Sequence, residues 1–153
     1  MPEVDDSAAA PPIRVLIADD SGMVRRLLGA IVEGDPACAL VGAARDGREA
    51  IALAADLRPD VCLLDLEMPV MGGIQALPHL RAVADLEVVV VSSIAQPGSE
   101  ERRTCLALGA AAVVGKPSGA VSPDLVERRG AEIRAAIRLA AGLRQPFPAP
   151  VDA

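Results

Sequence analysis

Five side chains that carry a charge or a hydroxyl group stand where short apolar runs of this sequence end. Asp19 and Asp20 follow one run, Asp65 a second, Ser92 a third and Lys116 a fourth. Short apolar runs are typical of strands buried on both faces of a parallel sheet, and the carboxyl ends of such strands meet at one edge. The sequence therefore predicts a single site that contains three carboxylates, one hydroxyl and one ammonium group.

Carboxylates brought this close together would repel one another and raise each other's pKa values. A divalent cation removes that conflict, and Mg²⁺ suits the site because it takes oxygen ligands and keeps several waters. We expect the protein ligands to be Asp20, Asp65 and the backbone carbonyl of Glu67, with Asp19 acting through a water.

Asp65 beside a metal ion has the arrangement of a carboxylate that accepts a phosphoryl group. Such a transfer depends on positioning the group and neutralising its oxygens. Lys116 supplies a compact charge for one oxygen, and Ser92 supplies a hydroxyl donor for another. Ser92 is preferred to Ser93 because it directly follows its apolar run. The chain holds fourteen arginines and one lysine, and that lysine follows the last predicted strand.

The elements that must position these residues are five apolar runs alternating with five segments of helical character. The predicted strands cover residues 13–18, 38–43, 61–64, 86–91 and 111–114, and the predicted helices begin near Ser21, Asp46, Ile74, Pro97 and Ser122. Right-handed crossovers turn this alternation into a parallel sheet covered on both faces. We expect an α/β fold with a doubly wound five-stranded parallel sheet, flavodoxin-like (βα)5, with strand order 2-1-3-4-5.

Composition places this fold in one domain, residues 13–143, between a disordered tail at 1–12 and a Pro-rich linker or tail at 144–153. Apolar residues make up 52% of the 153 residues, but Phe147 is the only aromatic one, so the core must be aliphatic. The net charge of −6 argues against a nucleic-acid partner. No apolar run approaches a membrane span and the start lacks a basic signal region, so we expect a cytoplasmic protein with no membrane partner.

These residues together resemble the receiver domain of response regulators, over about residues 13–143. The resemblance rests on Asp19-Asp20, on Asp65 as the phosphoacceptor, on Ser92 as the hydroxyl switch and on Lys116-Pro117, and it implies a cis bond before that proline. Longer stretches are similar to the receiver of the chemotaxis methylesterase, among them LIADDSGMVRRLL, DLEMPVM and GKPSG. The only histidine, His79, lies in a predicted helix, so no Ser-His-Asp set can be assembled. We expect a fragment or a free-standing receiver without the methylesterase domain.

The resemblance implies a signalling switch rather than an enzyme. A histidine kinase would phosphorylate Asp65, and the surface of the last two helices and the last strand would change its partner, an output protein or a C-terminal effector domain. Two departures from the family are Gly72, where an Asp is usual, and Val113, where an aromatic residue is usual. The alternatives are a degenerate receiver that only binds partners, or a Mg²⁺-dependent phosphatase, which would usually have Asp where this chain has Glu67.

Overall fold

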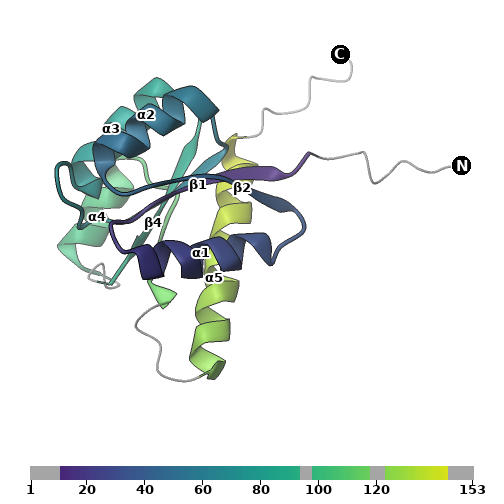
Figure 1. The fold of residues 1–153 in the computed structure, drawn as a ribbon. Helices are drawn as coiled ribbons and strands as arrows, with labels where there is room; N and C mark the ends of the chain where they lie inside the picture. The colour runs from purple at the N-terminus through teal and green to yellow at the C-terminus, as the bar shows by residue number, and fades with distance from the viewer. Residues whose placement is uncertain (1–10, 94–97, 118–122, 145–153) are drawn as a thin grey trace, which may run out of the picture.

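The computed structural model describes residues 11–93, 98–117 and 123–144, and these residues form the predicted fold (Figure 1). The strands are β1 (Ile13–Ala18), β2 (Cys38–Ala44), β3 (Val61–Leu64), β4 (Glu87–Ser92) and β5 (Ala112–Gly115). The helices are α1 (Gly22–Glu33), α2 (Gly47–Leu57), α3 (Gly73–Val83), α4 (Glu100–Ala107) and α5 (Pro123–Arg144). The strands form one parallel sheet in the order β2-β1-β3-β4-β5, which confirms the fold class and the topology.

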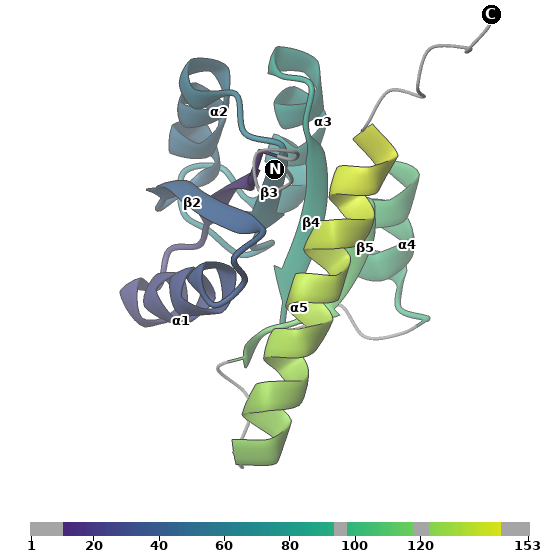
Figure 2. The same ribbon diagram turned by 90° about the vertical axis from the view of Figure 1, so that its right-hand side faces the viewer.

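Helices cover both faces of this sheet, with α1 and α5 on one face and α2, α3 and α4 on the other (Figures 1 and 2). Neighbouring residues of β1 belong to different cores: Leu16 packs on the side of α2 and α3, while Val15 and Ile17 pack on the side of α1 and α5. Both faces of a strand in such a sheet are buried, which explains the apolar runs at residues 15–18 in β1, 61–64 in β3 and 88–91 in β4.

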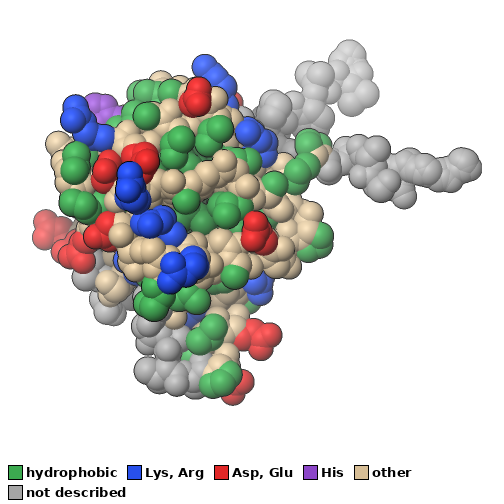
Figure 3. All heavy atoms as spheres, in the orientation of Figure 1, with side chains coloured by type: hydrophobic (Ala, Val, Ile, Leu, Met, Phe, Trp, Pro, Cys, Tyr) green, Lys and Arg blue, Asp and Glu red, His purple; other side chains and the backbone are tan. Residues whose placement is uncertain are grey.

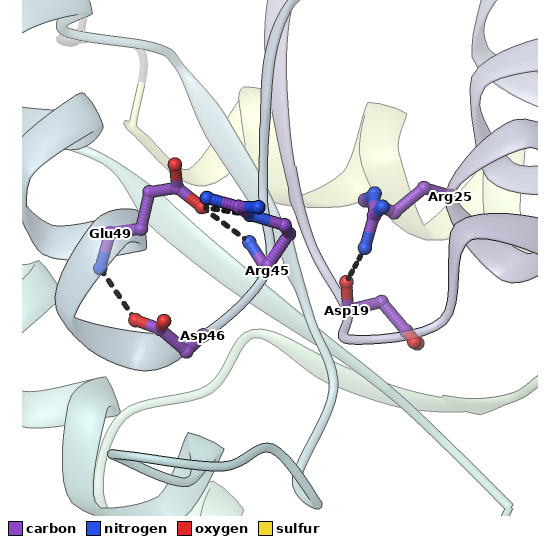
Figure 4. Close-up of polar contacts among 5 residues, drawn as sticks. All are labelled: Asp19, Arg25, Arg45, Asp46 and Glu49. Carbon is purple, nitrogen blue, oxygen red and sulfur yellow. Dashed lines mark hydrogen bonds and ion pairs between the residues drawn. The ribbon is translucent and has the colours of Figure 1, made fainter.

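Side chains at the helix starts explain why α1 and α2 begin where they do. The hydroxyl of Ser21 accepts the Val24 N–H at the predicted start of α1. At the predicted start of α2, the carboxylate of Asp46 accepts the Glu49 N–H (Figure 4). The Glu49 carboxylate bonds the N–H of Arg45 and thereby completes a variant of the capping box, one residue earlier than the usual arrangement.

Some predicted ends of helices and strands differ from the structure. The strand expected at 86–91 runs from Glu87 to Ser92, so the predicted site serine is the last strand residue rather than the first residue after it. The helix expected from Pro97 begins at Glu100, because the Ser99 hydroxyl accepts the Arg102 N–H and caps it. Pro97 itself lies outside the described residues.

The apolar residues Ile133, Ile137 and Ala140 are buried in the later turns of α5. Val126, in an earlier turn of the same helix, is 42% exposed. The first turns of α5 project beyond the sheet, as Figure 2 shows, so this part of the helix has no sheet to pack against.

The cysteines, the surface charges and the chain ends bear on the remaining features of the whole chain. Cys38, Cys62 and Cys105 are buried and free. Within the described segments, no helix has the length and apolar character needed to cross a membrane. On the face shown in Figure 3, acidic and basic side chains are interspersed rather than gathered into one basic patch. The predicted tails at 1–12 and 144–153 lie mostly outside the described residues, so those boundaries stay predictions.

Candidate functional site

Asp19 is fixed by three hydrogen bonds directly after β1. Its N–H donates to the carbonyl of Ala44 at 3.0 Å, and its own carbonyl accepts Nη1 of Arg25 at 2.8 Å (Figure 4). Its Oδ1 accepts the N–H of Ser21 at 2.9 Å. Because the side chain is completely buried, only Oδ2 is left to face the site.

Asp65 occupies the equivalent position after β3 and is 2% exposed. Its N–H donates to the carbonyl of Ala18 at 2.9 Å, which continues the pairing of β1 with β3 for one more residue. The loop that follows folds back so tightly that Gly73 lies against the Asp65 backbone and donates its N–H to Leu66 at 2.9 Å. A Cβ at Gly73 would collide with the carbonyl oxygen of Asp65, so this loop needs glycine here.

Lys116 extends to this pair of carboxylates from the end of the edge strand β5. It follows β5, which is separated from β3 by β4, and two strand spacings span about 10 Å. Only a long side chain covers that distance. Its Nζ lies 3.1 Å from Oδ2 of Asp19 and 3.2 Å from Oδ1 of Asp65, and the side chain is 14% exposed.

Burial and charge act against each other at these groups. Burial raises the pKa of Asp65, the neighbouring Asp19 raises it further, and Lys116 and the Glu67 N–H offset only part of the effect. Burial acts to lower the pKa of Lys116, but the charges of Asp65 and Asp19 outweigh it and the pKa is raised. One ammonium group therefore stabilises the charges of two carboxylates incompletely.

The carboxylates of Asp19, Asp20 and Asp65 form a cluster that fits a divalent cation. One oxygen from each lies within 4.8 Å of the others, and Asp20 is exposed at the mouth of the cluster. Oδ2 of Asp19 is paired with the Lys116 ammonium group, whereas Oδ2 of Asp65 is buried and accepts no hydrogen bond from the described residues. A buried carboxylate oxygen nearly always has a partner, so this atom in an acidic cluster indicates a place for a cation, and an all-oxygen set suits Mg²⁺.

The other predicted residues lie along the same edge of the sheet. Ser92 is 4% exposed at the end of β4, in register with Gly115 of β5, whereas Ser93 is exposed. Glu67 lies in the loop after β3 with its side chain exposed. No peptide bond of the described residues is cis, so the cis Lys116–Pro117 bond implied by the resemblance is wrong, and the bond has the commoner trans geometry of X–Pro bonds.

Sequence reasoning missed several residues that hold the site together. Arg25 holds the Asp19 carbonyl and Arg129 donates Nη1 to the Lys116 carbonyl at 2.9 Å, while Gly73 makes room for Asp65. Nothing in the sequence singles out these two among fourteen arginines. The Gly72-Gly73 pair indicated that a loop lies here, but not that Gly73 has to make room for Asp65.

Comparison with known proteins decides the family. The sequence profile described as the response regulator receiver domain matches residues 15–127. This chain belongs to the response regulator receiver domain family. The domain is 42% identical over 117 residues to the protein-glutamate methylesterase/protein-glutamine glutaminase of Halalkalibacterium halodurans, covering 76% of this chain and 34% of that protein. The domain is 44% identical over 133 residues to protein-glutamate methylesterase/protein-glutamine glutaminase 3 of Syntrophomonas wolfei, covering 86% of this chain and 38% of that protein.

Solved structures give the same result for this receiver domain. The response regulator domain of Thermotoga maritima CheB superposes with a TM-score of 0.80 at 36% identity, covering 88% of this chain and 99% of that one. CheY6 of R. sphaeroides, solved with the P1 domain of CheA3, belongs to a structure that matches with a TM-score of 0.72 at 33% identity, covering 87% and 99%. The chain spans about a third of the length of the curated relatives, and the match lies in the receiver part, which confirms the predicted resemblance.

Proposed function

We propose that this receiver accepts a phosphoryl group on Asp65 from a histidine kinase, with Mg²⁺ bound, and then changes its preference for a protein partner in cytoplasmic, chemotaxis-type signalling. One observation carries the proposal. The ammonium group of Lys116 contacts both Asp19 and Asp65, while Oδ2 of Asp65 is buried and accepts no hydrogen bond from the described residues.

In the proposed transfer, a carboxylate oxygen of Asp65 forms a bond to phosphorus while the bond from phosphorus to the donor atom breaks. The donor atom, a histidine nitrogen in the kinase, keeps the electron pair of that bond. In this proposal Lys116 holds an oxygen of the transferred group by its charge, and Ser92 holds another by hydrogen bonding. Mg²⁺, when bound, neutralises negative charge on the carboxylates and the phosphoryl oxygens. Asp20, Asp65 and the Glu67 carbonyl are the proposed ligands, with Asp19 acting through a water.

Two solved relatives support parts of the proposal. The complex of CheA3 P1 with CheY6 supports a chemotaxis-type kinase as the partner. A CheX–CheY complex from Borrelia burgdorferi, with a TM-score of 0.66 at 25% identity, contains BeF3 and Mg²⁺, which supports the cation. The output partner, whether a separate protein or a C-terminal effector domain, is proposed only by its class.

The test is phosphorylation by acetyl phosphate with and without Mg²⁺, followed by intact-protein mass spectrometry. We expect one added phosphoryl group on the wild type with Mg²⁺, none after chelation, and none on Asp65→Asn. The exposed Asp56→Asn is the matched control and should be labelled like the wild type. Labelling that persists on Asp65→Asn would contradict the proposal, as would turnover of phosphate monoesters, which indicates a phosphatase. An unlabelled wild type that still binds a partner would indicate a degenerate receiver.

A further inference from the structure

Arg129 of α5 holds the backbone from which Lys116 extends. Its Nη1 donates to the Lys116 carbonyl at 2.9 Å, and the arginine is only partly exposed. Lys116 directs its Nζ to Asp19 and Asp65, more than one strand away from its own Cα. A small shift of the Lys116 backbone would therefore move the ammonium group away from both carboxylates.

Gly115 makes this contact possible. A Cβ added at this residue would collide with Nη1 of Arg129 and would lie 3.1 Å from its Cζ. The two described glycines with a positive φ are Gly98 and Gly109, so the backbone angle of Gly115 does not require glycine. The guanidinium group lies where a side chain at residue 115 would be, and the absence of that side chain lets Arg129 pack on the strand end.

The position of β5 explains why such a contact matters. β5 is the last strand of the sheet and pairs with β4 alone, so a neighbouring strand fixes its backbone on one side only. Arginines from the two adjacent helices supply further bonds: Arg102 of α4 donates to the Val113 carbonyl at 3.0 Å, and Arg129 of α5 donates to Lys116. The end of β5 that carries the lysine is thus tied to α5 as well as to β4.

We propose that Arg129 is the positioning residue of Lys116. We also propose that residue 115 is glycine because a side chain there would occupy the place of the Arg129 guanidinium group. The inference rests on the proposed function for its consequence, because the position of the lysine matters for phosphorylation only if Asp65 is the acceptor. It also gives this chain a physical connection between the site and α5 that uses backbone hydrogen bonding, in a protein where Val113 replaces the usual aromatic residue.

The single lysine of the chain makes the test specific. Protein labelled with ¹³C-lysine, without a lysine-containing tag, gives one side-chain Cε signal. In the wild type we expect two distinct Hε resonances, because the lysine stem is held in one conformation. In Arg129→Ala these should merge towards the values of free lysine while the circular dichroism spectrum stays unchanged. The rate of labelling by acetyl phosphate should fall between about twofold and tenfold, as expected for the loss of one hydrogen bond.

Gly115→Ala should reproduce both effects by displacing the guanidinium group. In the Arg129→Ala background, Gly115→Ala should then add nothing, because the space it fills is already vacant. Arg128→Ala, the neighbouring exposed arginine, is the matched control and should leave the lysine signal and the rate unchanged. If Arg129→Ala does not fold, Arg129→Gln keeps part of the stem and serves for the same comparison.

The outcomes separate this inference from the proposed function. Unchanged Hε resonances and an unchanged rate in Arg129→Ala would overturn the positioning role while leaving Asp65 as the acceptor. Additive effects of Gly115→Ala and Arg129→Ala would overturn the proposed reason for the glycine. A wild type that acetyl phosphate does not label would count against the proposed function, but the lysine resonances would still show whether Arg129 positions Lys116.

Discussion

Nζ of Lys116 lies 3.2 Å from Oδ1 of Asp65, although β4 separates the strands that carry the two residues. The contact uses one carboxylate oxygen and leaves Oδ2 of Asp65 buried, with no hydrogen bond from the described residues. The site therefore holds a partly neutralised carboxylate with one oxygen free for a cation or for phosphorus.

Replacing Lys116 by Met removes the charge and keeps most of the length of the side chain. Two buried carboxylates then lose their shared counterion, and we expect the free energy of unfolding without Mg²⁺ to fall by about 3 kcal/mol. With Mg²⁺ the loss should be smaller, because the cation supplies the missing positive charge. Urea unfolding followed by circular dichroism measures both values, since the chain has no tryptophan. Equal losses with and without Mg²⁺ would show that the lysine does not share the carboxylates with a cation.

Asp20→Asn tests the metal cluster without disturbing the fold. Asp20 is exposed, so the metal-free variant should be about as stable as the wild type. Its carboxylate belongs to the acidic cluster, and its loss should weaken Mg²⁺ binding about tenfold. Calorimetric titration with Mg²⁺ measures the affinity, and the shift in Tm produced by Mg²⁺ should shrink accordingly. The exposed Asp56→Asn should bind Mg²⁺ like the wild type, and an unchanged affinity in Asp20→Asn would exclude it as a ligand.

The sequence was sufficient to predict the fold because each strand of a sheet covered on both faces contains a short apolar run. The part of a strand that is buried on both faces is an apolar run, so the first polar residue after that run marks its end, as Asp19 and Asp65 do. Ser92 shows the limit of this reasoning. It lies inside β4 because its pairing with Gly115 carries the strand one residue further, and pairing between strands leaves no periodic signal in either of them.

The convergence of Asp19, Asp65 and Lys116 was also predictable, since parallel strands end at one edge. The supporting contacts were not, because they depend on backbone close approaches and on the direction of long side chains. Glycine is needed at residue 73 because the loop after β3 folds back against the Asp65 carbonyl. The spacing of residues along the sequence does not indicate this contact. Arg129 could be chosen among fourteen arginines only once α5 had been placed beside β5.

The pair formed by Asp35 and Arg138 predicts a pH dependence of stability. The buried Asp35 carboxylate accepts the Ala37 N–H at 2.9 Å and two bonds from the Arg138 guanidinium, at 2.7 and 3.0 Å. The Ala37 N–H, together with Arg138 and against the effect of burial, lowers the Asp35 pKa below its ordinary value of 3.8. A lowered folded-state pKa stabilises the fold fully above the unfolded-state pKa, and this contribution is lost as the pH falls through the folded-state value.

Asp35→Asn should therefore lower the free energy of unfolding at pH 7 by about 1 kcal/mol, a modest value because solvent screens the 58% exposed Arg138 side chain. The difference from the wild type should narrow below about pH 4. Urea unfolding at several pH values measures it, with the exposed Glu132→Gln on the same helix as the control. A difference that stays constant down to pH 3 would show that the charge of Asp35 contributes nothing.

Val70 predicts a gain in stability from a substitution beside the site. It lies in the loop between β3 and α3 with φ at +69°, in the left-handed region, and its side chain is 73% exposed. A β-branched residue is strained there, by roughly 1–2 kcal/mol, and its exposed side chain gains little from packing. Val70→Gly should raise the free energy of unfolding by about 1 kcal/mol, because the relief of strain exceeds the entropy cost of glycine. The same substitution at the exposed helical Val126 should lower it, so destabilisation at both positions would show that Val70 is not strained.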